Sequence, residues 1–255
     1  MMGNYFQAER IKYRHTTMSV ITFLMPLVCV LLSAWLTHHY FLVDSYNWWY
    51  IGLYPGYVGI LCGMLGRRDK NKKNYTICSL PCSMGKIWDA KILLGAVMSG
   101  ISTLFIVILT ILVGKGIETG LHMEFLASPA VTVQILAGIL MWLTALWEIP
   151  FCLFLVQKVG TFLTLVIHMG FYTIMAAIIS LKPWFPLFPG AITARLMCPV
   201  LGVMPNGLLL QPGQMGYSTQ LAAPWVLPIG ILGSLIWFGI LWAWSRRWFE
   251  RKVVS

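Results

Sequence analysis

The chain has 255 residues, of which 58% are hydrophobic and only 10% are charged. Soluble domains carry about 25% charged residues, and a single core of this size could not bury so much apolar surface. The composition therefore excludes soluble enzymes, collagen, disordered tails and disulfide scaffolds, and it predicts an all-α integral membrane protein. The net charge of +10 does not indicate a nucleic-acid partner, because the basic clusters contain no base-reading motif with interleaved aromatic residues.

Runs of about 20 apolar residues predict six transmembrane helices within a single domain covering residues 1–255. In chain order, these helices cover residues 17–37, 48–65, 92–114, 130–157, 161–181 and 224–244. Most Lys and Arg residues fall in three clusters at alternate ends of these runs, at residues 10–14, 67–91 and 246–252. Cytoplasmic loops carry an excess of Lys and Arg, so we expect a multi-pass protein of the cell membrane with both termini in the cytoplasm.

The second predicted helix carries a stripe of glycines. They are separated by four, three, four and three residues, at Gly52, Gly56, Gly59, Gly63 and Gly66. This spacing places them on one helical face, and small residues let two membrane helices approach closely. Two partners fit the stripe: another helix of the same bundle, or a second subunit. The sequence does not separate them.

Residues 66–91 form a basic segment between the second and third predicted helices. Pro81 disfavours helix at the residue before it, whereas Ser83 can cap a new helix that continues into the membrane. A structured, amphipathic segment at the inner face could offer a docking surface to a cytoplasmic protein. The alternative is a solvated run of charge with no partner.

No phosphate-binding loop, nucleophile elbow or metal-binding helix motif occurs in the sequence. We therefore expect no catalytic residue, metal or cofactor in this chain. Two ionisable residues lie within predicted membrane helices. A carboxylate at mid-membrane costs about 2.5–3.5 kcal/mol, so Glu148 should face the bundle or a wet cavity, where it could bind a cationic group. Alternatively, Glu148 and the neighbouring Pro150 mark a helix-breaking site near the cytoplasmic third, with Glu148 paired to Lys158 or to another subunit. We expect His168 to be a hydrogen-bonded packing residue.

A proline-rich segment precedes the last predicted helix. Residues 181–228 contain eight of the 13 prolines, yet they remain apolar, and Arg195 is the single charge between residues 183 and 223. A flexible extracellular loop would be polar. Irregular backbone at membrane depth must be buried in protein or line a cavity. Residues 182–223 are therefore expected to re-enter the outer leaflet or cap the bundle.

Five motifs stand out along the chain: NYFQAERIKYRHT at residues 4–16, NWWY at 47–50, SLPCSMGKIWDAKIL from residue 79, WEIPFCLF at 147–154 and ARLMCPVLGVMPNG at 194–207. Together they resemble the lantibiotic immunity permeases of the MutE/EpiE type, which belong to the ABC-2 type permeases. The resemblance covers nearly the whole chain, and the stretch at residues 194–207 is its most specific part.

The resemblance implies a permease subunit that pairs with a second, related permease and with two copies of a cytoplasmic ABC ATPase. ATP and Mg would be bound by that ATPase and not by this chain. The assembly would expel lantibiotic peptides from the membrane of a Gram-positive bacterium and so give self-immunity or resistance. The N-terminal residues 1–16 would form a helix along the inner membrane interface, and residues 66–91 would hold the coupling loop.

The resemblance and the position of each residue also indicate site residues. Coupling to the ATPase is expected at Lys73, Tyr75, Ile77, Leu80 and Pro81. Packing of a subunit is expected at Gly52, Gly56, Gly59 and Gly63. A substrate path or gate is expected at Glu148, Trp184, Phe185, Phe188 and Arg195.

Three other interpretations remain open at the level of sequence. The chain could be an ABC-2 permease that exports another peptide or a lipid. It could be an immunity protein that sequesters the peptide without transporting it. It could also be a membrane enzyme that uses Glu148 and His168.

Overall fold

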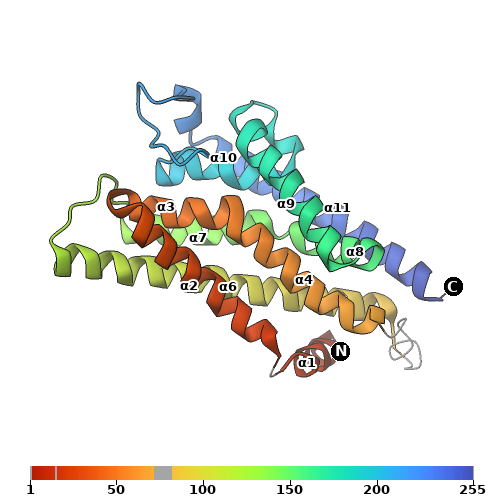
Figure 1. Ribbon diagram of the computed structural model, residues 1–255. Coiled ribbons are helices and arrows are strands. Elements are labelled where there is room, and N and C mark those ends of the chain that lie inside the picture. Colours follow the sequence, from red (N-terminus) through yellow and green to blue (C-terminus); the bar gives the residue numbers. More distant parts are fainter. Residues whose placement is uncertain (1, 15, 72–81, 255) are drawn as a thin grey trace.

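Long apolar segments of the chain fold into helices that lie side by side (Figure 1). The computed structural model describes residues 2–14, 16–71 and 82–254. The α-helices are α1 (Met2–Lys12), α2 (Thr17–Leu36), α3 (Phe41–Trp48), α4 (Tyr54–Asn71), α6 (Met84–Leu121), α7 (Val131–Ala145), α8 (Glu148–Val159), α9 (Thr161–Ile178), α10 (Pro189–Leu201) and α11 (Val226–Val254). Within the described residues the strand-like pairing is limited to an isolated bridge between Val203 and Leu209.

Five helical segments of the described chain are long and apolar enough to cross a membrane. They are Thr17–Leu36, Met84–Gly120, Val131–Val159, Thr161–Leu181 and Val226–Lys252. Each overlaps one of the predicted membrane helices. The remaining predicted helix, at residues 48–65, falls on α3, a π-helical turn at Trp49–Leu53 and α4.

The π-helical turn has a local cause in the sequence. Pro55 lies at the start of α4 and has no backbone N–H to give to the carbonyl of Ile51. The N–H of Tyr54 bonds instead to the carbonyl of Trp49, five residues earlier. This wider turn lets the chain continue from α3 into α4 without an end to the helical path.

Two other membrane helices differ from their predicted form. Helix α6 has 38 residues and would be roughly 55 Å long at 1.5 Å per residue, so it is longer than the bilayer core of about 30 Å. The predicted helix at residues 130–157 is divided at Leu146 and Trp147 into α7 and α8. Pro150 lies in the first turn of α8, where the missing N–H would have no partner within the helix.

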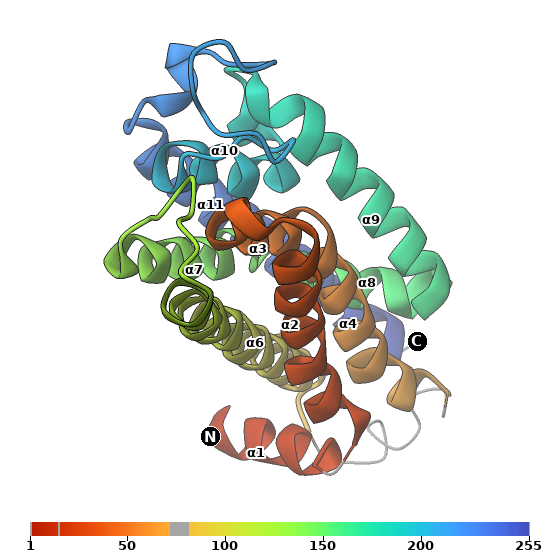
Figure 2. The same cartoon turned by 60° about the vertical axis from the view of Figure 1, so that its left-hand side comes forward.

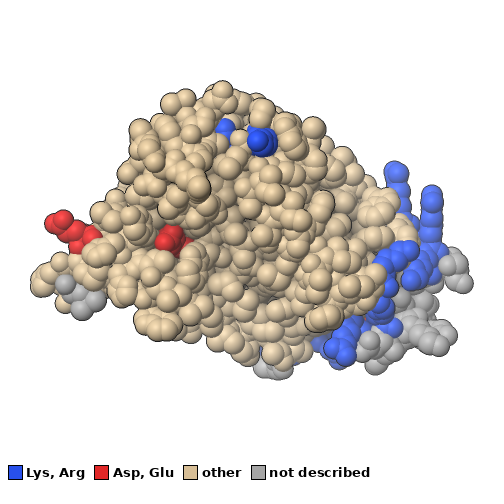
Figure 3. All heavy atoms as spheres, turned by 45° about the horizontal axis from the view of Figure 1, so that its top comes forward, with Lys and Arg blue, Asp and Glu red and all other residues tan. Residues whose placement is uncertain are grey.

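The helices are arranged so that the two ends of the bundle differ. Figures 1 and 2 show α1 lying across one end of the bundle and α10 near the opposite end. Helix α10 is buried from Pro189 to Cys198 and contacts α7, α9 and α11. Most Lys and Arg side chains on the face in Figure 3 gather at one end, and the acidic side chains lie away from that end.

Candidate functional site

The predicted coupling residues lie in a segment that α4 and α6 flank. Lys73, Tyr75, Ile77, Leu80 and Pro81 all fall within residues 72–81, which lie outside the described residues. On both sides of that segment the chain is helical, because α4 continues to Asn71 and α6 begins at Met84. Helices α4 and α6 are therefore the described elements on either side of the predicted coupling segment.

A buried cluster of four charged side chains connects α1 to these two flanking helices. Lys91 of α6 is fully buried, and its Nζ lies 3.0 Å from Glu9 Oε2 and 2.5 Å from Asp69 Oδ2. Lys12 Nζ lies 2.9 Å from Glu9 Oε1 and 3.0 Å from Asp69 Oδ1. Two cations and two carboxylates thus alternate in one cluster, which satisfies the requirement that buried charges be paired.

The electrostatics of this ion cluster favour the charged form of Asp69. Burial acts to raise the pKa of Asp69, but the positive charges of Lys91 and then Lys12 outweigh it and hold the pKa below the ordinary value of 3.8. Tyr13 lies beside the cluster, and its hydroxyl donates a hydrogen bond to the carbonyl of Leu65 at 2.8 Å. Lys91 donates to the same carbonyl at 3.2 Å.

Sequence reasoning assigned Lys91 to a basic segment at the inner face of the membrane and did not find this cluster. The available signal was the pair of isolated acids, Glu9 and Asp69, each within a basic stretch. Their side chains meet Lys91 only when α1 crosses the ends of α4 and α6. The spacing of the residues in the chain does not contain that information.

The start of α6 is also fixed against the C-terminal helix. Trp88 stacks on Phe249 of α11 with ring centroids 4.6 Å apart, and its indole N–H donates to Ser245 Oγ at 3.0 Å. Asp89 accepts a hydrogen bond from Trp242 at 2.7 Å. Residues 86–91, with the sequence KIWDAK, therefore connect α6 to α11 through Trp88 and Asp89, and to α1 and α4 through Lys91.

A second group of polar side chains is buried in the middle of the bundle. Glu148 at the start of α8 and His168 in α9 are both fully buried, with 3.3 Å between Oε2 and Nε2. The hydroxyls of Tyr54 and Tyr172 and the indole N–H of Trp147 are also buried without a hydrogen-bond partner in the protein. Glu148 and His168 were treated as separate residues at the level of sequence, and the fold brings them together.

Lys158, the alternative partner for Glu148, has a different position in the structure. Its ammonium group lies 4.8 Å from the ring centroid of Trp248 and 5.8 Å from that of Phe154. The pairing of Glu148 with Lys158 is therefore wrong. Among the described residues, no group of three or more His, Cys, Asp and Glu side chains could hold a metal ion.

The glycine stripe contacts helices of the same chain. A Cβ on Gly59 would lie 2.6 Å from Leu165 Cδ2, and one on Gly63 would overlap the side chain of Thr161. One on Gly56 would lie 3.5 Å from Met169 Sδ. These contacts belong to α9, so the structure favours the partner inside the bundle for these three positions. Gly52, by contrast, has open space where its Cβ would be.

The predicted gate residues divide between buried and exposed positions. Phe185 is buried, whereas Trp184 is 47% exposed and stacks edge-to-face on the half-buried Phe188. Arg195 in α10 is almost fully buried, and its Nη2 donates to the carbonyl of Gln220 at 2.6 Å. Its guanidinium also lies 5.7 Å from the ring centroid of Phe185. Arg195 thus joins α10 to the segments before and after it.

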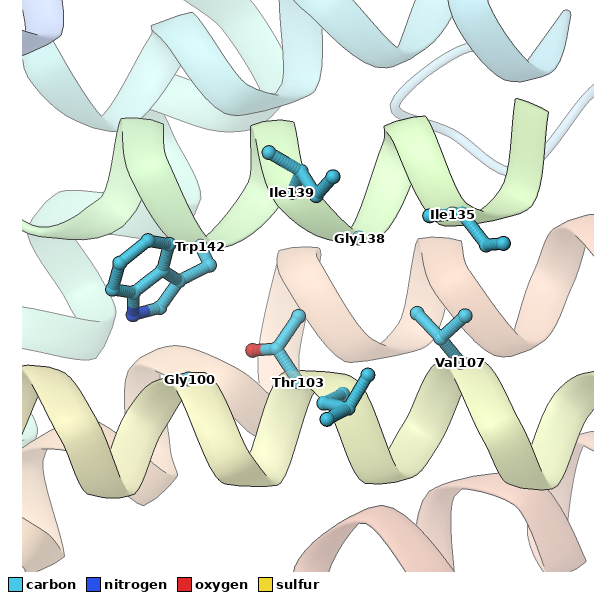
Figure 4. A pocket seen from close by; sticks show the side chains of 8 residues that line it. Gly100, Thr103, Val107, Ile135, Gly138, Ile139 and Trp142 are labelled. Carbon is cyan, nitrogen blue, oxygen red and sulfur yellow. The ribbon is translucent and has the colours of Figure 1, made fainter. Parts of the chain in front are cut away.

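An apolar groove of about 260 Å³ runs between α6 and α7. Figure 4 shows Trp142 and Thr103 on opposite sides of it, with Gly100 and Gly138 on the two helices. Leu104 and Ile139 at its edges are 60% and 55% exposed. Thr103 lines the groove, and its buried hydroxyl has no hydrogen-bond partner in the protein. The walls of the groove are therefore predominantly apolar.

Comparison with known proteins identifies the family of the chain. A family model described as "ABC-2 family transporter protein" matches residues 5–177. That region extends from α1 to the last turn of α9, so it includes the ion cluster, the glycine stripe and Glu148. Comparison with curated proteins and with solved structures gave no match. Since the family model covers well over half of the sequence, the chain belongs to the ABC-2 transporter family.

Proposed function

We propose that this chain is the permease subunit of a transporter that expels lantibiotic-type antimicrobial peptides from the cell membrane. Membership of the ABC-2 family makes it a membrane permease that works with an ABC ATPase. The substrate class is the proposed part. It is supported by the motif at residues 194–207 and by the chemistry of the bundle end that carries α10.

The proposed topology has six membrane crossings and cytoplasmic termini. The continuous helical path through α3, the π-helical turn and α4 would provide the sixth crossing. The positive-inside rule supports a cytoplasmic location for the basic end of the bundle, where both termini lie in Figure 1. Residues 182–223, with the buried helix α10 between two irregular stretches, would then form the re-entrant segment on the outer side. A Gram-positive host is inferred from the resemblance alone.

The proposed partners are two copies of a cytoplasmic ATPase, which would bind ATP and Mg, and a second related permease. The ATPase would contact residues 72–81, including Lys73, Tyr75, Ile77, Leu80 and Pro81. The ion cluster supports this assignment, because it holds both flanking helices and α1 together at the cytoplasmic end. A movement of the coupling segment would therefore be transmitted to three helices at once.

The single observation that carries the substrate class is a set of large apolar side chains, called the rim here, that are exposed in the stretches before and after α10. It consists of Trp184, Leu187, Met215 and Trp225, which are 47%, 66%, 81% and 56% exposed. Lantibiotics are commonly cationic and amphipathic, so they partition into the outer leaflet. The rim can contact their apolar face. Residues 182–225 contain two cations, of which Lys182 is exposed and Arg195 is almost fully buried.

The test is ATP-driven release of a fluorescent lantibiotic from proteoliposomes that contain the permease pair and the ATPase. Replacing Trp184 and Leu187 together with Ser should reduce release about tenfold or more, because each large apolar contact contributes about 1.5–3 kcal/mol. The matched control is Trp35→Ser, since Trp35 is 70% exposed at the end of α2. Equal release by the double variant and the wild type would refute the rim as the site of peptide capture.

A second candidate function is export of a lipid or another apolar molecule. The groove between α6 and α7 favours it, because its walls are apolar and accessible from the membrane side of both helices. ATP-dependent movement of a labelled lipid, abolished by Gly138→Leu and unaffected by the rim variant, would support this candidate. Protection of cells in the absence of any ATPase would instead indicate peptide sequestration without transport.

A further inference from the structure

A separate cavity lies at the basic end of the bundle, between the last turns of α4 and the junction of α8 with α9. Its volume is about 360 Å³, within the range of ligand sites of roughly 300–1,000 Å³. The residues that line it are Arg67, Lys70, Val156, Gly160, Thr161 and Phe162. None of these belongs to the ion cluster or to the groove between α6 and α7.

The cavity carries excess positive charge. Lys70 Nζ donates to the carbonyl of Val156 at 2.8 Å, which holds the ammonium group at the cavity wall. Burial, and then the positive charge of Lys252, lower the pKa of Lys70 below 10.5, so a second cation is close. Arg67 is exposed. No acidic residue is among the described residues that line the cavity, and the adjacent Asp69 is turned toward Lys12 and Lys91.

The first turn of α9, which includes the cavity residues Thr161 and Phe162, also has backbone hydrogen-bond donors. Gly160 has φ +88° and ends α8, and a Cβ at this position would meet nothing within 4 Å. Helix α9 begins directly after it, without a side-chain hydrogen bond to its first turn. The N–H groups of a helix's first turn are free to bind an anion, and the helix dipole favours negative charge there.

The cavity also opens beside an apolar surface. Phe162 at its edge is 79% exposed, and Leu163 and Val166 on α9 are 44% and 55% exposed. A molecule with a negative headgroup and apolar chains would match both parts. We propose that this cavity binds the phosphate of an anionic membrane lipid between Arg67, Lys70 and the start of α9, with the acyl chains along α9.

This inference rests on the membrane placement given under the proposed function. Basic pockets between membrane helices at the cytoplasmic side bind anionic headgroups, and the position of Phe162 and Leu163 beside the cavity distinguishes a lipid from a soluble anion. A free phosphate has the same charged chemistry as the headgroup, but it has no apolar part to contact the apolar surface of α9. An acidic surface of the ATPase is a different class of partner, and the test below separates it.

The experiment measures, by native mass spectrometry, the phosphatidylglycerol that the full chain retains after extraction from phosphatidylcholine vesicles containing phosphatidylglycerol. Arg67→Gln and Lys70→Gln should each reduce retention roughly fivefold, the effect of one basic residue near an anionic surface. Arg67→Lys keeps the charge and should retain most of the lipid. The matched control is Arg247→Gln, which removes one charge from α11 outside the cavity.

Equal losses in Arg67→Gln and Arg247→Gln would show diffuse attraction instead of a site and would overturn the proposal. Stabilisation of the wild type by inorganic phosphate, with no retained phosphatidylglycerol, would identify a soluble anion and also overturn it. A pull-down of the tagged chain with the ATPase gives the remaining comparison. If Arg67→Gln lost the ATPase in that pull-down but retained as much lipid as the wild type, the cavity would be an ATPase contact and the lipid proposal would be overturned. If the wild-type chain bound no ATPase in the pull-down, the proposed function would be refuted. The lipid measurement would still test the cavity, because it does not depend on the ATPase.

Discussion

Glu9 in α1 and Lys91 in α6 form an ion pair of 3.0 Å although 82 residues separate them. The same ammonium group contacts Asp69 near the end of α4. One buried lysine therefore joins the N-terminal helix to both helices that flank residues 72–81. Any change in the distance between α4 and α6 at this end must break or rearrange these contacts, which makes Lys91 the central residue of the cluster.

Replacing Lys91 with Met should destabilise the protein by about 3–5 kcal/mol, because it leaves two carboxylates buried without their main partner. Lys12→Met is the matched control. The Lys12 side chain is 22% exposed, whereas Lys91 is fully buried, so water can replace more of the contacts of Lys12 and the loss of stability should be smaller. Unfolding of both variants in mild detergent gives the comparison. Equal destabilisation would contradict the central role of Lys91.

The ion cluster should respond to acid in a defined range. The pKa of Asp69 is lowered below 3.8 in the folded protein, so its ionised form stabilises the cluster fully above that pH. The contribution is lost as the pH falls below 3.8 and through the lowered pKa. Spin labels at the exposed positions Ile11 and Leu93 would report the distance between α1 and α6. We expect an unchanged distance from neutral pH to about 4 and separation below it.

The control for this acid transition is Asp69→Asn, which cannot titrate. This variant should show the same label distance on both sides of pH 3.8. A transition of unchanged size in Asp69→Asn would assign the acid response to another group.

Adding a methyl group to the glycine stripe should have opposite effects at two positions. In Gly63→Ala the new Cβ overlaps the Thr161 side chain, which is β-branched and stiff, so we expect destabilisation of about 1–3 kcal/mol. In Gly52→Ala the Cβ meets nothing within 4 Å, and the expected effect is neutral or slightly stabilising. Thermal unfolding in detergent measures both. A similar loss in the two variants would indicate that Gly52 faces a partner subunit.

Glu148 and His168 should behave as an energetically coupled pair. A double-mutant cycle with Glu148→Gln and His168→Gln should give a coupling free energy of about 0.5–3 kcal/mol, the range for residues in contact. The cycle with Lys158→Gln in place of His168→Gln should give a value near zero, since Lys158 lies over Trp248. Coupling of Glu148 to Lys158 would refute the position of α8 relative to α9.

The membrane class of the protein and the approximate limits of its helices follow from composition and the length of apolar runs. These features are local: a run of about 20 apolar residues is helical in a bilayer whatever its neighbours are, because each backbone group must be satisfied within the segment. The predicted helix at residues 161–181 coincides with the observed segment Thr161–Leu181. The break at Leu146 and Trp147 lies directly before Glu148, where the sequence offered a helix-breaking site as one alternative, but both residues continue the apolar run and did not mark its position.

The sequence also indicated candidate residues, but it did not show which of them meet. It identified Glu148 and His168 separately, since an ionisable side chain in an apolar run is visible without a structure. It assigned Lys91 to a basic segment, since the sequence does not reveal that α1 crosses α4 and α6. It did not identify the partner of the glycine stripe. Small residues are needed for close packing against another helix, whether that helix belongs to the same bundle or to a second subunit.

By itself, the sequence determined that the chain is a helical membrane protein with one strongly basic end, because hydropathy and charge are properties of single residues. Only the tertiary structure decided that Lys91 is buried between Glu9 and Asp69, that Glu148 faces His168, and that Gly59 packs on α9. Each of these contacts joins residues on different helices. Their distances depend on how the helices cross, and helix crossing is set by the packing of all the side chains together.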